Sequence, residues 1–134
     1  MCMVDFDGDG FVTPIEDGHY VGARKIHRCA ECRRAIVSGE RYHTEAHVFE
    51  GRFTRHKTCT HCMVAREWLR QECGGWIYRE VRADILEHCQ EGRYPFALYR
   101  IAVGMSQHWL TAAGDLRPIP SLPQTTHERM NHAR

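Results

Sequence analysis

Apolar residues recur at helical spacing in two stretches just past the middle of the chain. The pattern predicts one helix over residues 60–72 and a second over residues 76–91, and each is followed by glycine, a common stop signal. The apolar stripe of the first helix consists of Val64, Ala65, Trp68 and Leu69. The stripe of the second consists of Ile77, Val81, Ile85 and Cys89. Both helices are therefore amphipathic, with one face to bury.

A third helix is predicted over residues 95–110, where Pro95 occupies a favoured first helical position. Counted from Tyr94, this segment is apolar around most of its circumference, so it is either the central core helix or an oligomer contact. An uncovered side would form an apolar patch, which soluble monomers rarely keep without a use. We expect a second copy or another partner to meet the 94–110 helix, unless Ile119 and Leu122 of the tail fold back over it.

Residues 36–59 have the pattern of a β-hairpin. A strand over residues 41–49 is followed by a tight turn at Glu50-Gly51 and by a return strand that begins at Phe53. Residues 1–23 are rich in glycine and aspartate instead, which predicts a loop with a short strand at Tyr20-Val21.

Two Cys-x-x-Cys pairs flank this hairpin, and 26 residues separate them. The two-residue spacing lets both thiolates of a pair reach one tetrahedral ion, and the second pair stands at a helix N-terminus, whose dipole favours thiolates. The predicted zinc ligands are Cys29, Cys32, Cys59 and Cys62. Four thiolates leave no open position for water or substrate, so this zinc would be structural and contribute on the order of 10 kcal/mol to folding.

The ligand set has one alternative. His56 lies three residues before Cys59, so it could replace Cys62, as in LIM or poly(ADP-ribose) polymerase-type fingers. Cys62 is preferred because it completes a symmetric, helix-borne pair, and His56 would then lie beside the site or on the surface. His43 and His61 are expected to be exposed polar side chains. The remaining cysteines are expected to be small buried apolar residues, namely Cys2, Cys73 and Cys89.

Length and composition place the chain among globular proteins of one modest domain. It has 134 residues, of which 43% are hydrophobic and 26% charged. The predicted fold is α+β, with a treble-clef-like zinc module of knuckle, hairpin and helix followed by a helical domain of two to three helices. Its parts are an acidic N-terminal loop segment (1–23), the zinc module (24–72), a helical region packed on it (73–114) and a proline-rich, partly disordered tail (115–134).

Cysteine usage and hydropathy bear on location. The odd number of cysteines, seven, favours metal ligation over a disulfide framework. No stretch resembles a transmembrane span or a secretory signal. We therefore expect a cytoplasmic protein without a membrane partner.

The net charge of +1 hides an asymmetry along the chain. Residues 1–23 hold five acidic residues and no Lys or Arg, whereas residues 24–70 hold eleven basic residues against five acidic ones. A basic finger could contact nucleic-acid phosphates, although it could equally be a solvated surface or meet the acidic segment. The candidate contacts are Arg24, Lys25, Arg28, Arg33, Arg34, Arg52, Arg55 and Lys57.

The acidic segment contains the string of an EF-hand calcium loop. Its ligand positions would be Asp5, Asp7, Asp9 and Glu16. Only four residues precede Asp5, so there is no entering helix, and Gly18 and Gly22 disfavour an exiting one. We therefore expect a solvated acidic loop and no calcium binding.

Catalysis is not expected. Treble clefs host His-Asn-His nucleases, but the one asparagine here is Asn131, in the tail. A metal-dependent nuclease is therefore the least favoured function, and the sequence favours a protein that is not an enzyme.

Several motifs within residues 1–90 resemble a family of small phage- and prophage-encoded proteins of no established activity. The motifs are Val21-Gly22-Ala23-Arg24-Lys25-Ile26-His27-Arg28-Cys29-Ala30-Glu31-Cys32, Ile36-x-x-Gly39-Glu40-Arg41-Tyr42, Lys57-Thr58-Cys59-x-x-Cys62 and Arg66-Glu67-Trp68-Leu69. The resemblance implies phage origin, zinc binding and a location in the cytoplasm of a bacterial host. The leading hypothesis is an interaction protein that binds and modulates a host macromolecule, such as a defence or transcription complex. A nucleic-acid-binding finger that uses the basic face of residues 24–57 is the alternative.

Overall fold

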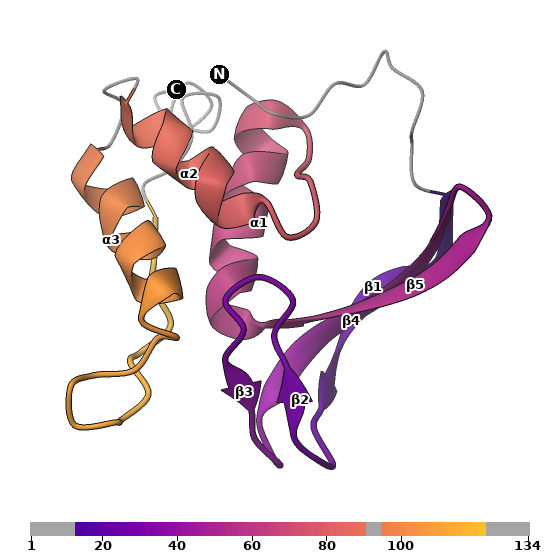
Figure 1. Cartoon of the computed structure of the whole chain (residues 1–134), viewed down its shortest axis with the longest axis horizontal. Coiled ribbons are helices and arrows are strands. Elements are labelled where there is room, and N and C mark those ends of the chain that lie inside the picture. Colours follow the sequence, from indigo (N-terminus) through magenta and orange to yellow (C-terminus); the bar gives the residue numbers. More distant parts are fainter. Residues whose placement is uncertain (1–12, 91–94, 123–134) are drawn as a thin grey trace, which may run out of the picture.

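A computed structural model of the chain describes residues 13–90 and 95–122. Its elements, in chain order, are β1 (Thr13–Gly22), β2 (His27–Arg28), β3 (Ala35–Ile36), β4 (Arg41–Phe49), β5 (Arg52–Cys59), α1 (Thr60–Cys73), α2 (Val81–Gln90) and α3 (Pro95–Ser106) (Figure 1). The expected α+β class is confirmed. The boundaries between the four proposed parts stay a prediction.

A three-stranded antiparallel sheet has β4 at its centre, between β1 and β5. The expected hairpin is confirmed: Phe49 pairs with Arg52, and both turn residues, Glu50 and Gly51, have positive φ angles of 51° and 76°. The expected short strand at Tyr20-Val21 is confirmed as part of β1, but the expectation of a loop was wrong for residues 13–19, because β1 begins at Thr13. The pairing of β1 with β4 is irregular between Pro14 and His19, which breaks the two-residue alternation that marks a strand in sequence.

The first predicted helix is confirmed almost to the residue. Helix α1 ends at Cys73, and Gly74 follows in the left-handed conformation with its N–H bonded to the Arg70 carbonyl. The second helix was predicted five residues too early, since α2 begins at Val81. Residues 76–80 form a loop instead, in which Arg79 has φ 70° and donates its N–H to the Glu31 carboxylate at 3.0 Å. Tertiary contacts thus override the apolar spacing that placed Ile77 on a helix.

The third helix ends at Ser106, four residues earlier than predicted. The chain reverses at His108 and Trp109, whose φ angles are 56° and 57°. The reversal folds the Trp109 indole onto Gly104, where a Cβ would lie only 2.3 Å from the ring. Glycine at position 104 is therefore needed to let the indole approach, and Trp109 is buried beside the helix rather than on it.

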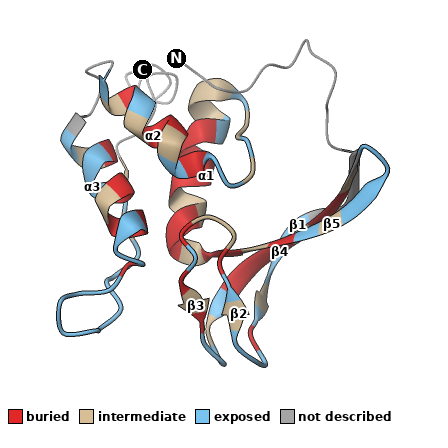
Figure 2. Cartoon of the chain, in the orientation of Figure 1, coloured by how far each residue is buried: buried red, intermediate tan, exposed pale blue. Residues whose placement is uncertain are grey.

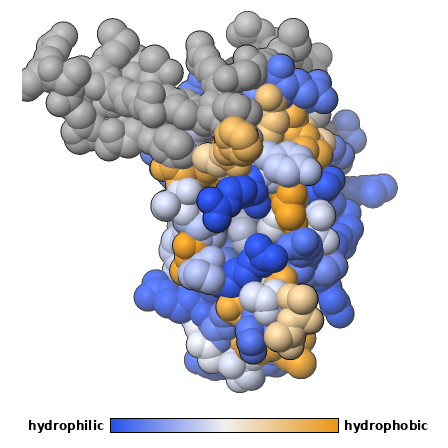
Figure 3. All heavy atoms as spheres, turned by 90° about the vertical axis from the view of Figure 1, so that its left-hand side faces the viewer, coloured by the Kyte–Doolittle hydropathy of each residue, from blue (hydrophilic) through white to orange (hydrophobic). Residues whose placement is uncertain are grey.

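The three helices share one core with the cysteine-bearing segments (Figure 2). Leu98, Ile101 and Met105 are buried, which confirms that α3 is a core helix. Its other side leaves Phe96 83% and Tyr99 57% exposed. The coloured atoms in Figure 3, which faces this side of the molecule, show apolar side chains interspersed with hydrophilic ones.

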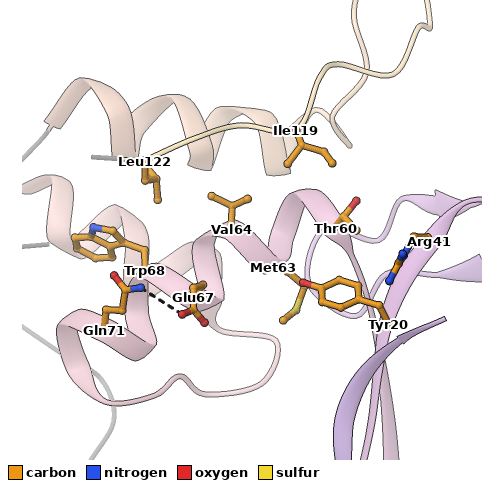
Figure 4. Close-up of a pocket in the computed structure, with 10 residues that line it drawn as sticks. All are labelled: Tyr20, Arg41, Thr60, Met63, Val64, Glu67, Trp68, Gln71, Ile119 and Leu122. Atoms are coloured by element: carbon orange, nitrogen blue, oxygen red, sulfur yellow. Dashed lines mark hydrogen bonds between the residues drawn. The ribbon is translucent and has the colours of Figure 1, made fainter. Parts of the chain in front are cut away.

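The tail packs on α1. Ile119 and Leu122 line a hollow of about 580 Å³ together with Val64 and Trp68 of α1 and Tyr20 of β1 (Figure 4). Leu122 is half-buried against the core, whereas Ile119 is exposed. The alternative expectation, a tail that covers the outer face of α3, is not met at Phe96 and Tyr99, which stay exposed.

Candidate metal centre

Four thiols meet at the junction of the sheet and the helices. The Sγ atoms of Cys29, Cys32, Cys59 and Cys62 all lie within 4.8 Å of one another, and all four residues are buried. Cys29 and Cys32 lie in the turn between β2 and β3, Cys59 ends β5, and Cys62 lies in the first turn of α1. The Ala30 N–H donates to the Lys57 carbonyl at 2.8 Å, which fastens the turn to β5. The two pairs that are far apart in sequence are thereby brought together.

The spacing of the sulfurs fits a tetrahedral ion. Zinc–thiolate bonds of ~2.3 Å separate the sulfurs of a tetrahedral site by about 3.8 Å. The Sγ atoms of Cys32 and Cys59 lie 3.8 Å apart. The buried cluster can therefore hold a metal ion with its four thiols.

The four thiols lie close enough to shift one another's pKa values in opposite directions. Hydrogen bonds from the Cys29 and Cys32 thiols lower the pKa of Cys59 far below its usual value. The hydrogen bond with Cys29 in turn raises the pKa of Cys32 and of Cys62, and burial adds to both increases. Without a positive ion the four groups cannot all be thiolates, and a divalent cation would remove this conflict.

Two N–H groups donate to the sulfurs from different parts of the chain. The backbone N–H of Cys59 donates to Cys29 Sγ at 3.3 Å, and the indole Nε1–H of Trp109 donates to Cys62 Sγ at 3.3 Å. Such donors neutralise part of the thiolate charge and orient the ligand. Trp109 belongs to the segment that returns after α3, so the reversal at residues 108–109 serves the cysteine cluster.

We expect Trp109→Phe to weaken metal binding about 10- to 100-fold, the range for loss of a hydrogen-bond partner of a metal ligand. The measurement is a competition titration against a zinc chelator of known affinity. Trp68→Phe is the matched control, because Trp68 is equally buried but its Nε1 has no hydrogen-bond partner in the described part of the chain. Equal weakening in both variants would show that loss of the indole packing, rather than of the N–H to Cys62, is responsible.

His56 is not part of the four-thiol cluster. Its ring is buried and stacks on Tyr78 and His47, with centroids 3.9 and 4.8 Å away. Burial, and then the neighbouring His47, lower the pKa of His56 to about 4. The ring therefore stays neutral near neutral pH and acts as a packing element between β4, β5 and the loop after α1.

The expectation that His43 and His61 are exposed was wrong, because both are buried. His43 packs edge-on against Tyr20 across the pairing of β4 with β1. His61 Nε2 lies 2.6 Å from the Arg117 carbonyl oxygen. The sequence did not reveal that the central strand and the start of α1 are covered.

The basic residues do not form one continuous face. Arg34 is buried and bonded to Glu40, with Nη1 2.9 Å from Oε1, so it is not available to a phosphate. Arg28 and Arg33 lie at the cysteine turn, Arg24 and Lys25 lie in the turn before β2, and Lys57 lies beside β2 with its Nζ 3.1 Å from His27 Nδ1, whereas Arg52 and Arg55 lie further along β5. Arg52 pairs with Phe49, at the far end of β4, and nine residues of strand span on the order of 30 Å. Seven of the eight candidates thus divide into two groups.

A buried ionic network, which the sequence did not predict, lies next to the cysteines. Arg66 is 0% exposed and bonds Glu31 Oε2 at 2.9 Å and Glu45 Oε1 at 2.7 Å. The rings of Trp76 and Tyr78 each lie 5.1 Å from its guanidinium carbon, and the Tyr78 hydroxyl donates to Glu45 at 2.8 Å. The one available signal was Glu31, a carboxylate placed between two metal-ligand candidates.

The sequence also singled out three cysteines outside the cluster and the acidic string near the N-terminus. Cys73 and Cys89, expected to be buried, are half-buried, and Cys73 forms a disulfide. Cys2, Asp5, Asp7 and Asp9 lie outside the described residues. The backbone of Glu16 belongs to β1, so no helix leaves the acidic string at that residue.

Comparison with protein-family models, curated proteins and solved structures gives no match for this chain. Among the residues that the structure describes, no helix is long and apolar enough to cross a membrane. The fold and the site define its class: a small α+β protein whose sheet and helices converge on a buried four-cysteine cluster that could hold a metal ion.

Proposed function

We propose that this chain is a zinc-stabilised interaction protein. One zinc ion, held by Cys29, Cys32, Cys59 and Cys62 in a treble-clef arrangement, would fix the surfaces with which it binds a partner protein. The observation that carries the proposal is the burial of all four thiols within 4.8 Å of one another. Four protein ligands fill a tetrahedral ion, which leaves no position for substrate and favours a structural role over catalysis.

The surfaces support a protein partner. Exposed apolar residues, among them Phe96 and Tyr99 of α3, are of the kind that protein interfaces bury. α3 could meet a second copy in the same way. The resemblance to phage-encoded proteins supports a bacterial host as the source of the partner, a defence or transcription complex being the leading candidate, and the host cytoplasm as the place of action.

One observation favours nucleic acid as a second candidate. Arg24 and Lys25 in the turn before β2, and Arg28 and Arg33 at the cysteine turn, are exposed, and none has a carboxylate partner among the described residues. Four such cations could contact phosphates. The division of the basic residues into two groups, and the burial of Arg34, weigh against a single continuous phosphate-binding face.

The test combines metal content with partner capture. Native mass spectrometry is expected to give one zinc per chain, and cobalt substitution to give the absorption of a tetrahedral four-thiolate site. Immobilised zinc-loaded protein is expected to retain a specific protein from a bacterial host lysate, with or without prior nuclease treatment.

A column that carries the Cys62→Ser variant, treated identically, is the control. It shows whether capture of the partner depends on a surface that the metal organises. Capture that disappears after nuclease treatment, together with salt-dependent retardation of generic DNA, would support the nucleic-acid candidate instead. A chain that carries no metal would contradict the proposal, because the proposed surfaces depend on bound zinc.

A further inference from the structure

A second hollow lies between the cysteine turn and the segment that returns after α3. It has a volume of about 480 Å³. One wall belongs to the β2–β3 turn and the residues that follow it, and the other to residues 108–116, the loop after α3 in Figure 1. None of the four cysteines lines the hollow, but both walls are attached to the cluster, because Cys29 and Cys32 lie in the β2–β3 turn and Trp109, which donates to Cys62, lies in the second wall.

The lining contains three exposed aliphatic side chains from different segments. Val37 is 53%, Leu110 37% and Leu116 45% exposed. Leu110 and Leu116 pair across an isolated antiparallel bridge, and Thr111 donates its N–H to the Asp115 carbonyl at 2.8 Å. The loop therefore holds the two leucines side by side as a preformed apolar wall.

The rim of the hollow is cationic. Arg28 and Arg33 are both exposed, and Arg28 Nη1 donates to the Arg33 carbonyl at 3.1 Å, which holds the Arg28 guanidinium against the backbone of Arg33. Glu40, the carboxylate in the lining, is already bonded to the buried Arg34. Among the described residues no carboxylate pairs with Arg28 or Arg33, so their charges face outward unneutralised.

We propose that this hollow, the knuckle groove, docks an acidic, aliphatic segment of a protein partner. The inference rests on the proposed function and names the chemistry of the partner. Carboxylates would pair with the guanidiniums of Arg28 and Arg33, which suit bidentate recognition, while aliphatic side chains cover Val37, Leu110 and Leu116.

The lining favours a peptide over a nucleic acid. Bases are held by stacking on aromatic rings, and the groove offers only the imidazole of His108 for that purpose. Its apolar surface is aliphatic and is contributed by both walls, Val37 on one and Leu110 and Leu116 on the other, which matches leucine, isoleucine or valine side chains. Asp115 neighbours the lining residues Gly114 and Leu116 but does not line the groove itself.

The test uses the full zinc-loaded chain and a random decapeptide display library. We expect the enriched peptides to combine carboxylates with aliphatic residues. Their binding, followed by fluorescence anisotropy of a labelled synthetic copy, should weaken about tenfold or more in the double variant Arg28→Glu, Arg33→Glu. The matched control is Arg52→Glu, Arg55→Glu, the same charge change made on β5, which should bind as the wild type does.

A second variant tests whether weaker binding could result from a folding defect beside the cysteine turn. Val37→Asp places one carboxylate at an exposed position of the groove and should also weaken binding, with zinc content and circular dichroism unchanged. Library selection without acidic enrichment, equal weakening in the β5 control, or displacement of the peptide by a single-stranded oligonucleotide would each overturn the proposal.

The lysate experiment separates this inference from the proposed function. If the wild type captures a host protein and the Arg28→Glu, Arg33→Glu variant captures it equally well, the interaction protein stands and the knuckle groove is not its docking site. If the wild type captures a host protein and the variant does not, the proposed function and the knuckle groove as its docking site are both supported. Capture of no host protein by the wild type would count against the proposed function, while the peptide selection would still decide what the groove binds.

Discussion

Cys62→Ser is expected to leave the chain largely unfolded at temperatures where the metal-loaded wild type is folded. Metal binding at a site of this kind contributes on the order of 10 kcal/mol, whereas a domain of this size is stable by only about 5–15 kcal/mol. The four thiols also stand where the β2–β3 turn, β5 and α1 meet, so their separation releases all three elements. Thermal unfolding followed by far-ultraviolet circular dichroism gives the comparison, with chelator-treated wild type beside the variant.

Two further variants make the result specific. Cys89→Ser changes a free, half-buried thiol and should leave one zinc per chain and a similar unfolding temperature. His56→Ala removes a ring that stacks on Tyr78 but that is not one of the four ligands, so zinc should be retained. Loss of zinc in His56→Ala with retention in Cys62→Ser would show that the ligand choice is wrong, and a metal-free chain of unchanged stability would exclude a structural metal altogether.

The features that the sequence predicted well depend on short-range patterns. The hairpin turn at Glu50-Gly51, the stop of α1 at Gly74 and the two-residue spacing of each cysteine pair are local, and the structure has all three. Each is decided by the conformation or reach of a few consecutive residues.

The features that it missed depend on contacts between distant segments. Residues 76–80 stay out of α2 because Trp76 and Tyr78 lie against Arg66 and because Glu31 accepts the N–H groups of Arg79 and Val81. The α3 helix ends early because the Trp109 indole packs on Gly104 and donates to Cys62. No periodicity in a single segment encodes these contacts.

The count of charged residues also gave a wrong picture of the surface, because contacts between distant segments decide which of these residues are buried. A tally of arginines and lysines treats each as a solvated cation, yet Arg34 and Arg66 are buried beside their own carboxylates. Because these two arginines are buried, the basic residues within residues 24–70 do not form one continuous surface. The cations that remain exposed at the cysteine turn, Arg28 and Arg33 among them, become recognisable as a group only in the fold.

Arg66→Met is expected to destabilise the zinc-loaded protein by about 3–5 kcal/mol, because it leaves the buried carboxylates of Glu31 and Glu45 without their cation. Arg70→Met is the matched control. It makes the same change one turn further along α1, where the pair with Glu67 is about half exposed and contributes at most about 1 kcal/mol. Chemical denaturation of both variants at equal zinc content measures the difference.

A second substitution separates the charge from the packing. Glu31→Gln in the Arg66→Met background removes one unpaired buried charge and keeps one oxygen that can still accept from the Arg79 N–H. The amide NH2 replaces the other oxygen, which accepts from the Val81 N–H at 3.4 Å. We therefore expect this double variant to recover part of the lost stability, although Glu31→Gln alone destabilises the wild type by weakening its bond to Arg66. If the double variant is instead less stable than Arg66→Met, or if Arg70→Met costs as much as Arg66→Met, then the buried ionic network is not what fixes the loop of residues 76–80 on the metal-binding turn.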